Sequence, residues 1–249
     1  MADNNQITIH FGGDCRELWT DDGLTVSYSG GAVVLALRRD GGWLALAPPC
    51  RRGGNVKADY LAASAERELC ERLNARSAPP LTTAYFLAAA DAAEALQACE
   101  GDFTKLPQLL SAELSGGMDA LLPIELLRLL LDEYSLTWDD AAAHISRCCS
   151  YRAATNKTGA TVPLGALAAL QPRDARLVSA VNEKLCEKLR KAFPGDWDRV
   201  GACAVLRDGE LRLDILCAAL CGKTYSTKEQ RAGVFRTLFT LTPARFEDI

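Results

Sequence analysis

Histidine is scarce in this 249-residue chain: His10 and His144 are the only two, and they lie far apart in sequence. His144 has no recognisable partner for general acid–base work. The ten cysteines include no CxxC pair, and their closest spacings are Cys148-Cys149 and Cys217-x3-Cys221. Most of them stand among alanines and leucines at helical spacing, where cysteine acts as a small apolar residue. We therefore expect buried, reduced thiols and no bound metal.

Long apolar runs and basic clusters are also missing. No stretch of 18 apolar residues occurs, and the start of the chain, MADNNQITIH, has neither a basic nor an apolar leader segment. We therefore expect no membrane span, no signal peptide and a cytoplasmic location. The net charge is −4, and no basic face with interleaved aromatic residues is present. Nucleic acid is consequently not expected as a partner.

The composition is that of an ordinary globular protein, with 49% hydrophobic and 24% charged residues. A chain of this length fits one large domain or two small ones. The change in pattern near residue 50 divides it into a strand-rich part, 1–50, and a mainly helical α/β part, 55–249. We predict that both belong to one domain, 1–249.

Residues 6–47 alternate between apolar and polar residues and are punctuated by glycine turns such as Asp21-Asp22-Gly23, Gly30-Gly31 and Asp40-Gly41-Gly42. Short alternating runs between such turns predict an antiparallel β-meander. Pro48-Pro49 ends it. From residue 58 the period becomes helical, and Leu61, Ala65, Leu69 and Leu73 form one apolar stripe.

A second helix is predicted from a cap at Thr82 or Thr83 to Glu100, with Gly101 just beyond it. It would turn Phe86, Ala90, Ala93 and Leu96 inward. On pattern alone, its AYFLAAA segment could equally be a buried strand. The remaining elements follow from capping and turn signals. They are a strand at 109–114, a helix opening at Pro123, a helix capped by Thr137-x-x-Asp140, a loop at 152–163, a helix at 174–192, a hairpin around Asp208-Gly209, a helix through Leu220 capped by Gly222, a helix capped by Ser226-x-x-Glu229, and a turn at Thr242-Pro243.

Residues 109–151, LLSAELSGGMDALLPIELLRLLLDEYSLTWDDAAAHISRCCSY, closely resemble a segment of the α-glucan (glycogen/starch) phosphorylases. In that family a strand ends in an Asn-Asp-Thr-His-Pro loop, followed by a Pro-Glu-Leu helix, a Trp-Asp helix and a Tyr-Thr-Asn-His-Thr loop. The scaffold residues of this pattern are present here: Leu114, Leu121, Glu125, Leu126, Arg128, Asp132, Trp138, Ala142 and Tyr151. Further on, Phe193-Pro194-Gly195-Asp196, Asp198, Arg199 and Gly222 match the family's Phe-Pro-Gly-Asp-x-Asp-Arg segment and a turn glycine.

The polar residues of the family pattern are replaced in this chain. Ser115-Gly116-Gly117-Met118-Asp119 stands where the family has Asn-Asp-Thr-His-Pro, and Arg152-Ala153-Ala154-Thr155 follows Tyr151 in place of Thr-Asn-His-Thr. Lys223-Thr224 replaces a Ser-His pair. The degenerate positions are therefore Ser115, Gly116, Gly117, Met118, Ala153, Ala154 and Thr224, and we expect no catalytic residue among them. A phosphate-binding loop at Gly116-Gly117 is disfavoured against a plain turn, because the flanking pattern is absent.

The resemblance implies an α/β fold, a remnant of the phosphorylase N-terminal (Rossmann-like) domain. We expect an N-terminal β-meander and a short mixed sheet flanked by about seven helices, with Gly116 close to Ala153 in a cleft-shaped remnant of the family's sugar site. The family's pyridoxal phosphate and its lysine belong to a second domain that this chain lacks, so no cofactor is expected. Lys157 and Lys223 are the lysines weighed for that role. Glu125 is expected to anchor a neighbouring loop, and Asp139 and Asp140 to favour a helix start.

Two functions of different classes follow. The first is a pseudoenzyme: a glycogen phosphorylase-like protein without activity, with a binding or regulatory role in glucan metabolism through a protein partner or self-association. The alternative is one half of a split phosphorylase, completed by a partner chain that carries the pyridoxal phosphate. A chain that folds but has no selected role is a third possibility. Removing even one oriented donor from a catalytic pocket costs about 10²–10³ in rate, so activity of this chain alone is not expected.

Overall fold

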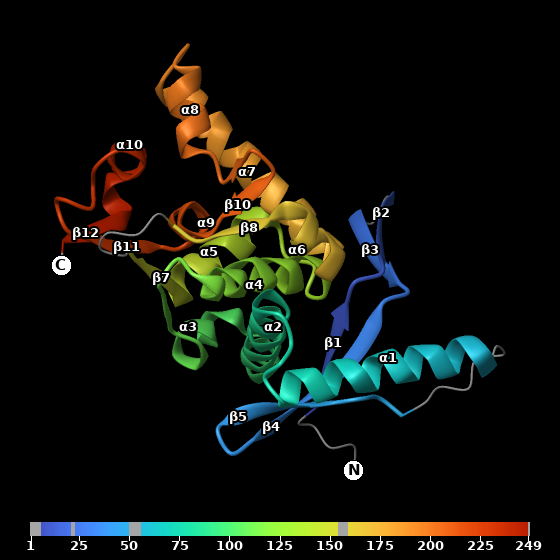
Figure 1. The fold of residues 1–249 in the computed structure, drawn as a ribbon. Helices are drawn as coiled ribbons and strands as arrows, with labels where there is room; N and C mark the ends of the chain where they lie inside the picture. The colour runs from blue at the N-terminus through green and yellow to red at the C-terminus, as the bar shows by residue number, and fades with distance from the viewer. Residues whose placement is uncertain (1–5, 21–22, 50–55, 154–158, 249) are drawn as a thin grey trace.

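A computed structural model describes residues 6–20, 23–49, 56–153 and 159–248 (Figure 1). Ala154, Thr155 and Lys157, singled out above, lie outside the described residues, as does the turn at Asp21-Asp22. The structure is α/β, with ten α-helices among the described residues where about seven were expected. None of the helices in these ranges has both the length and the apolar character that crossing a bilayer requires.

The first five strands form an antiparallel unit with a different connection from the predicted meander. They are β1 (Gln6–Phe11), β2 (Asp14–Thr20), β3 (Gly23–Ser29), β4 (Ala32–Arg39) and β5 (Gly42–Leu46). β1 pairs with β4 and not with β2, while β2 and β3 pair only with each other among the described residues. The meander prediction was therefore wrong in its pairing, although the described strands and the turn at Asp40-Gly41 are present.

The two pairings continue one another in a single register, Phe11 facing Ala32 and Asp14 facing Ser29. One long two-stranded ribbon therefore runs through all four strands and bends at two glycine pairs, Gly12-Gly13 and Gly30-Gly31. These four glycines have positive φ. In Figure 1 the β2–β3 part rises away from the β1–β4 part. The glycines that we interpreted as turns are thus the bend of the ribbon.

Helix α1 (Val56–Asn74) covers β4 and β5 by its C-terminal half. The Asn74 amide donates to the Ala45 carbonyl and accepts from the Ala45 N–H, both at 2.8 Å, and the Val33 N–H donates to Glu66 at 3.0 Å. Leu73 is buried, whereas Leu61 is 57% exposed. The predicted stripe was wrong at its start because residues four apart drift by about 40° around a helix with 3.6 residues per turn.

Helix α2 (Pro80–Ala98) lies at the centre of the molecule against α4 (Leu121–Asp132). The strand alternative for AYFLAAA is thereby excluded. Phe86, Ala90 and Leu96 are buried, as predicted, and Ala93 is half-buried. The predicted cap at Thr82 or Thr83 was wrong: the helix begins directly after Pro79, with Pro80 in its first position, where a missing N–H removes no helical hydrogen bond.

The main sheet is parallel throughout, not mixed. Its four strands are β12 (Phe246–Asp248), β11 (Lys223–Ser226), β7 (Cys149–Arg152) and β6 (Ala112–Leu114), in that spatial order. Parallel strands need crossover connections, and helices supply them: α4 and α5 (Trp138–Cys148) join β6 to β7, and α10 (Val234–Leu241) joins β11 to β12. The carboxyl ends of all four strands therefore meet at one edge.

The remaining elements surround this sheet. They are η1 (Phe103–Lys105), α3 (Leu106–Leu109), η2 (Met118–Ala120), β8 (Thr161–Pro163), α6 (Leu164–Leu170), α7 (Pro172–Ala192), α8 (Trp197–Cys203), β9 (Leu206–Arg207), β10 (Glu210–Arg212), α9 (Leu213–Leu220) and η3 (Pro243–Arg245). The strands β8, β10 and β9 form a small antiparallel sheet that contains the predicted hairpin around Asp208-Gly209. In α7 the predicted stripe of Leu177, Val181, Leu185 and Leu189 is buried.

Three further predictions are corrected by the described segments. The loop predicted at 152–163 includes the end of β7 and the whole of β8. Ser226 belongs to β11, and α10 begins only at Val234, so the Ser226 box caps no helix. Gly222 is not the cap of α9, which Cys221 closes in an extended conformation. A Cβ at Gly222 would instead collide with the Ser146 carbonyl oxygen of α5, so the close approach of two chain segments explains this glycine.

Substituting Gly13 by alanine should destabilise the protein much more than the same change at Gly41. Both residues have positive φ, which strains an L-residue by about 1–2 kcal/mol. At Gly13 the new Cβ would also lie 2.6 Å from the Ser29 carbonyl oxygen, whereas at Gly41 it would meet open space. Denaturant unfolding of G13A and G41A measures the difference. Equal losses would show that the bend does not depend on this close contact.

Candidate functional site

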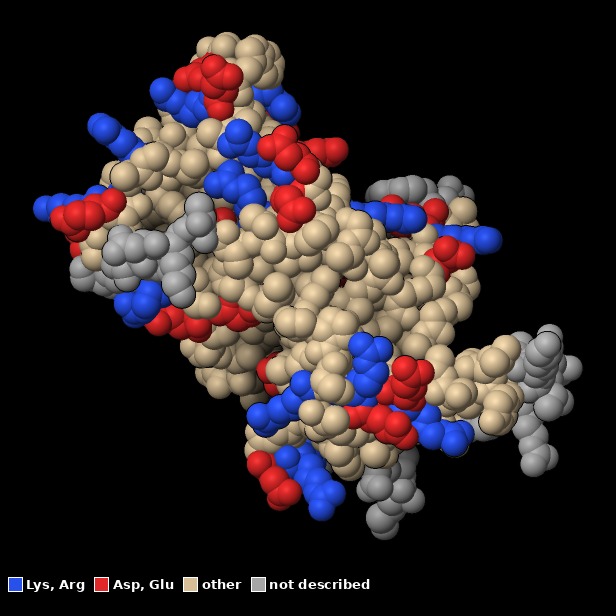
Figure 2. Space-filling view, viewed as in Figure 1, with Lys and Arg blue, Asp and Glu red and all other residues tan. Residues whose placement is uncertain are grey.

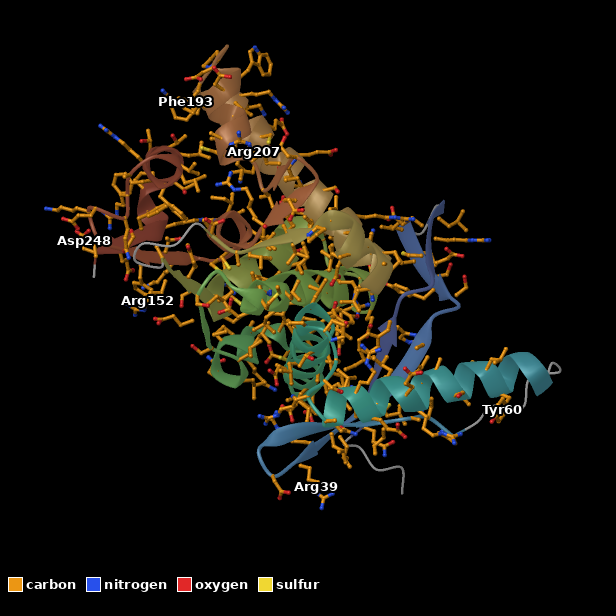
Figure 3. All side chains as sticks on the ribbon, viewed as in Figure 1. Arg39, Tyr60, Arg152, Phe193, Arg207 and Asp248 are labelled. Atoms are coloured by element: carbon orange, nitrogen blue, oxygen red, sulfur yellow. The ribbon has the colours of Figure 1, made fainter. Side chains whose placement is uncertain are left out.

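Five of the positions singled out in the sequence lie at the carboxyl edge of the parallel sheet: Ser115, Gly116, Gly117, Met118 and Ala153. Leu114, Tyr151 and Thr224 stand side by side in the register of β6, β7 and β11. The segments that follow these residues therefore leave the sheet in step, and Gly116 and Ala153 come to neighbouring strand ends, as expected from the alignment. Figure 3 shows Arg152, the last residue of β7, and Asp248, the last of β12, on the same side of the molecule. Ligands of open α/β sheets bind at this kind of edge.

The loop after β6 is held by Asp119. One oxygen of this carboxylate accepts from the Ser115 N–H at 2.6 Å and from the Ser115 hydroxyl at 2.8 Å. Its other oxygen accepts from the Gly117 N–H at 2.9 Å. Three hydrogen bonds from its own loop thus occupy this acid, and it acts as a local brace.

Gly116 lies directly against Tyr151. It has positive φ, and a Cβ there would lie 3.0 Å from the Tyr151 ring and 3.3 Å from the Asp214 Cα. Tyr151 is buried and stacks on Phe235 of α10, with ring centroids 6.0 Å apart. Burial, and then the charge of Asp214, raise the pKa of Tyr151 above its usual value. The phenol is therefore neutral at physiological pH. The Tyr151 ring also fills the space beside Gly116 that the side chain of a larger residue would need.

Asp214, at the start of α9, was missed by sequence reasoning. Its Oδ1 accepts from the Ile215 N–H at 2.8 Å, and its carboxylate lies where a Cβ on Gly159 would stand. Asp214 forms no ion pair with another described residue. An acid in the first turn of a helix is usually explained by the helix dipole, and the sequence gives no sign that this one lies beside Tyr151 and Gly159.

The other positions at this edge are small or already bonded. Ala153 is buried, and its carbonyl accepts from the Gln230 amide at 2.9 Å. Gln230 also accepts from the Thr227 N–H at 2.6 Å. Met118 is half-buried in the short helix η2. Thr224 does not reach the edge: it is fully buried inside β11, and its hydroxyl has no hydrogen-bond partner among the described residues.

The described lysine that we weighed for a cofactor does not suit that role. Lys223 forms an ion pair with Glu247 of β12 at 2.7 Å, and this hydrogen bond raises the pKa of the amine. A lysine that forms a Schiff base needs the opposite shift, because the neutral amine is the nucleophile. Lys223 is also the first residue of β11, at the amino end of the strand, so it neither belongs to the carboxyl edge nor fits a Schiff base with pyridoxal phosphate. His144 lies in α5, away from this edge, with its ring 5.9 Å from that of Phe103.

Glu125, Arg128 and Asp132, the charged scaffold residues of α4, form a buried network behind the edge loop. The Arg128 guanidinium donates to both oxygens of Glu125, at 2.8 and 2.6 Å. It also donates to the Tyr28 hydroxyl of β3 at 3.3 Å. Glu125 is 1% exposed, so this two-pronged geometry is what makes its charge tolerable inside the protein. Glu125 contacts Arg128 of its own helix, so its role as the anchor of a neighbouring loop stays a prediction.

The network continues through Asp132 into α7 and the ribbon. Arg173 of α7 donates to Asp132 at 2.8 Å and to Glu17 of β2 at 2.7 Å. The Tyr28 hydroxyl donates to Asp132 at 2.9 Å. Charged hydrogen bonds thus join three segments that are far apart in sequence: the ribbon, α4 and α7.

Asp174 is the most unusual member of this group. It is completely buried in the first turn of α7, and no described donor faces either of its oxygens; the Arg128 Nε is 4.0 Å away. Burial, and then the neighbouring charge of Glu125, raise its pKa well above the usual value. When protonated, Asp174 can donate to Glu125, which an ionised Asp174 could not do. The raised pKa of this buried acid favours its protonated, neutral form.

The nine described cysteines are free and buried, as predicted. They are Cys15, Cys70, Cys99, Cys148, Cys149, Cys186, Cys203, Cys217 and Cys221. Burial raises the pKa of Cys70 to about 11, which keeps its thiol protonated and unreactive. Within the described ranges, no group of three or more His, Cys, Asp and Glu side chains is arranged to hold a metal ion.

The comparisons with known proteins agree with the resemblance noted in the sequence. The profile of the carbohydrate phosphorylase family matches residues 79–248. The brain form of glycogen phosphorylase from Bos taurus is 27% identical over 156 residues, which are 59% of this chain and 18% of that protein. Glycogen phosphorylase from Bacillus subtilis is 28% identical over 110 residues, 43% of this chain and 14% of that protein. The chain thus spans less than a fifth of the length of these curated relatives.

Substituting Asp174 by asparagine should stabilise the protein increasingly as the pH rises. A carboxyl with a raised pKa in the folded state binds its proton more tightly than in the unfolded chain, where the pKa is about 3.9. The free energy of unfolding of the native protein therefore falls between pH 4 and the folded pKa, and the asparagine variant lacks this fall. Urea unfolding from about pH 4 to 8 tests this, with Asp198→Asn on exposed α8 as the control. A pH-independent difference between D174N and the native protein would contradict the raised pKa.

Replacing Arg128 by methionine should cost about 3–5 kcal/mol of stability, because Glu125 would keep a buried charge without its partner. The matched control is Arg152→Met. Arg152 makes the same two-pronged contact with Glu113, at 2.6 and 2.8 Å, but both side chains are about half exposed. Water replaces such a partner, so the R152M unfolding midpoint should stay close to that of the native protein. Similar losses in the two variants would show that burial does not set the strength of the Arg128 contact.

Proposed function

Because the chain belongs to the carbohydrate phosphorylase family, we propose that it is a catalytically inactive, glycogen phosphorylase-like protein with a binding or regulatory role in glucan metabolism. The observation that carries this proposal is which residues stand at the carboxyl edge of the parallel sheet. Glycine, methionine and alanine occupy the family's polar positions, and Asp119 is bonded to its own loop. Sugar recognition depends on buried polar groups that pair with hydroxyls, and the described edge offers few of them.

The same edge supports the finer assignment of the fold. Parallel strands joined by helical crossovers are the arrangement of Rossmann-like domains. We propose that the sheet β12-β11-β7-β6 corresponds to that of the phosphorylase N-terminal domain, and that residues 1–249 form a single domain in the cytoplasm. The Arg173 contacts with both α4 and β2 favour one domain, because they tie the strand-rich part to the helical part.

The proposed function does not involve pyridoxal phosphate. Lys223 stands at the amino end of β11, and its amine is in an ion pair with Glu247, so it is not available for a Schiff base. In this chain the edge residues instead brace the loop after β6 and fill the space beside Tyr151. We infer that the described residues use this edge for structure and not for chemistry.

The purified protein should release no glucose 1-phosphate from maltoheptaose, inorganic phosphate and pyridoxal phosphate. A full-length glycogen phosphorylase serves as the positive control in the same coupled assay. Calorimetric titration with maltoheptaose should give a dissociation constant no tighter than about 1 mM. Release above background, or saturable binding below that level, would overturn the proposal.

A second arm of the test separates the split enzyme from the pseudoenzyme. The tagged protein is purified from its native cells, and the fraction is assayed for phosphorolysis. We expect any copurifying protein to leave the fraction inactive. A phosphorylase-like companion that restores activity would replace the proposal by an enzyme of two chains.

A further inference from the structure

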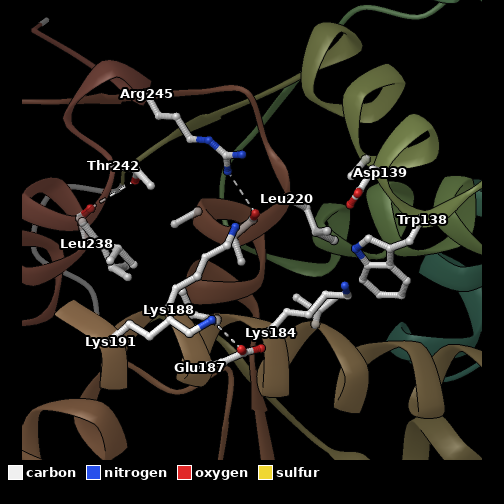
Figure 4. Close-up of a pocket in the computed structure, with 16 residues that line it drawn as sticks. Trp138, Asp139, Lys184, Glu187, Lys188, Lys191, Leu220, Leu238, Thr242 and Arg245 are labelled. Carbon is white, nitrogen blue, oxygen red and sulfur yellow. Dashed lines mark hydrogen bonds and ion pairs between the residues drawn. The ribbon is translucent and has the colours of Figure 1, made fainter. Parts of the chain in front are cut away.

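Basic side chains surround a cavity where α7 meets α9, α10 and the start of α5. Its volume is about 290 Å³, close to the lower limit of small-molecule sites, which is about 300 Å³. Figure 4 shows Lys184, Lys188 and Lys191 along α7, with Arg245 on the opposite wall and Trp138 at one end. On the face shown in Figure 2, by contrast, basic and acidic side chains are interspersed.

Two of the lysines have no carboxylate partner among the described residues. Lys184 and Lys188 are one helical turn apart, so both face the cavity. The Lys184 ammonium lies 4.9 Å from the centre of the Trp138 ring, and Lys188 points into the space between α7 and Arg245. Lys191, in contrast, is paired with Glu187 at 2.7 Å. The cavity therefore presents two ammonium groups to whatever enters it.

Arg245 completes the basic wall from the other side. One of its terminal nitrogens donates to the Ala219 carbonyl at 3.0 Å and to the Cys221 carbonyl at 3.4 Å. These bonds fix the guanidinium, and its other donors bond to no acceptor among the described residues. Arginine held in this way is suited to a carboxylate or a phosphate.

The inner surface of the cavity is apolar. It is formed by Ala142, Val181, Leu185, Ala218, Leu220, Leu238 and Leu241. Trp138 adds an aromatic wall. An inorganic anion would leave this surface in contact with water, whereas an anion with an apolar body would cover it.

The net charge of the cavity lining is positive, opposite in sign to the net charge of the whole chain. Four basic residues, Lys184, Lys188, Lys191 and Arg245, face two acids, Asp139 and Glu187, which leaves two positive charges in excess. The whole chain carries −4. A concave region of one sign with low-dielectric walls concentrates ligands of the other sign.

We propose that this cavity binds a small organic anion: a carboxylate or phosphate group on an apolar body of the size of an aromatic ring. The anionic group contacts Lys184, Lys188 and Arg245, and the ring lies on the apolar surface beside Trp138. Leu220 precedes β11 and Arg245 precedes β12, so the cavity lies toward the amino ends of these strands. The carboxyl edge described above is at the other end, and the proposal is independent of its state.

Calorimetric titration with four probes tests the proposed chemistry: phenyl phosphate, benzoate, inorganic phosphate and benzyl alcohol. We expect saturable binding of phenyl phosphate or benzoate, and at least tenfold weaker binding of inorganic phosphate and benzyl alcohol, which each lack one half of the ligand. The tighter of the first two identifies the anionic group. The proposal is overturned if neither saturates up to about 10 mM, or if benzyl alcohol binds as well as both.

Variants locate the site. The double variant Lys184→Gln, Lys188→Gln should weaken binding of the tighter probe by about tenfold, or about 1.4 kcal/mol. The matched control is Arg190→Gln, which removes a positive charge from the same helix outside the cavity. Both should unfold at temperatures near that of the native protein, since all three side chains are exposed. Unchanged affinity in the double variant, or an equal loss in R190Q, would place the binding elsewhere and refute the proposal.

Discussion

The ion pair between Arg128 and Glu125 allows charged side chains to be buried in the interior of this protein. Neither side chain could be buried alone, because an isolated ion in a medium of low dielectric constant costs several kcal/mol. Paired through two short hydrogen bonds, they allow α4 to be buried along most of its length while keeping polar contacts to β3. The ribbon, α4 and α7 then share one charged network through Asp132 and Arg173. Since α4 directly follows the loop of the carboxyl edge, the same network fixes the position of that loop.

Local signals in the sequence predicted the elements that depend on local physics. The stripe of α7, the hairpin at Asp208-Gly209 and the Thr137 cap are present, since each needs only neighbouring residues. The errors arose where tertiary contacts decide. β1 pairs with β4 because the glycine pairs bend a continuous ribbon, and α1 turns Glu66 and Asn74 inward because strand N–H and C=O groups bond to them. Helical or alternating patterns carry no information about such partners.

The sequence predicted the part of the candidate site that follows from the order of the segments in the family pattern. The resemblance placed the loop after β6 beside the end of β7, and the parallel register brings Gly116 and Ala153 together. It did not indicate Asp174 or Asp214, because a single acid in a first helical turn has the same sequence signature when exposed as when buried. Nor did it indicate the basic cavity: Lys184 and Lys188 are one turn apart on α7, but their opposite wall comes from Arg245, more than fifty residues later. Long-range packing creates both features.

The nine buried thiols have a consequence for how local opening of this fold can be followed. They are distributed over β2, α1, α5, β7, α7, α8 and α9, with Cys99 just beyond α2 and Cys221 just beyond α9. An alkylating reagent reacts with a thiolate that solvent can reach, so each cysteine reports the opening of its own element. The order in which the native protein is labelled over time would rank these elements by local stability. The chain thus carries its own set of probes for mapping which parts separate first from the core.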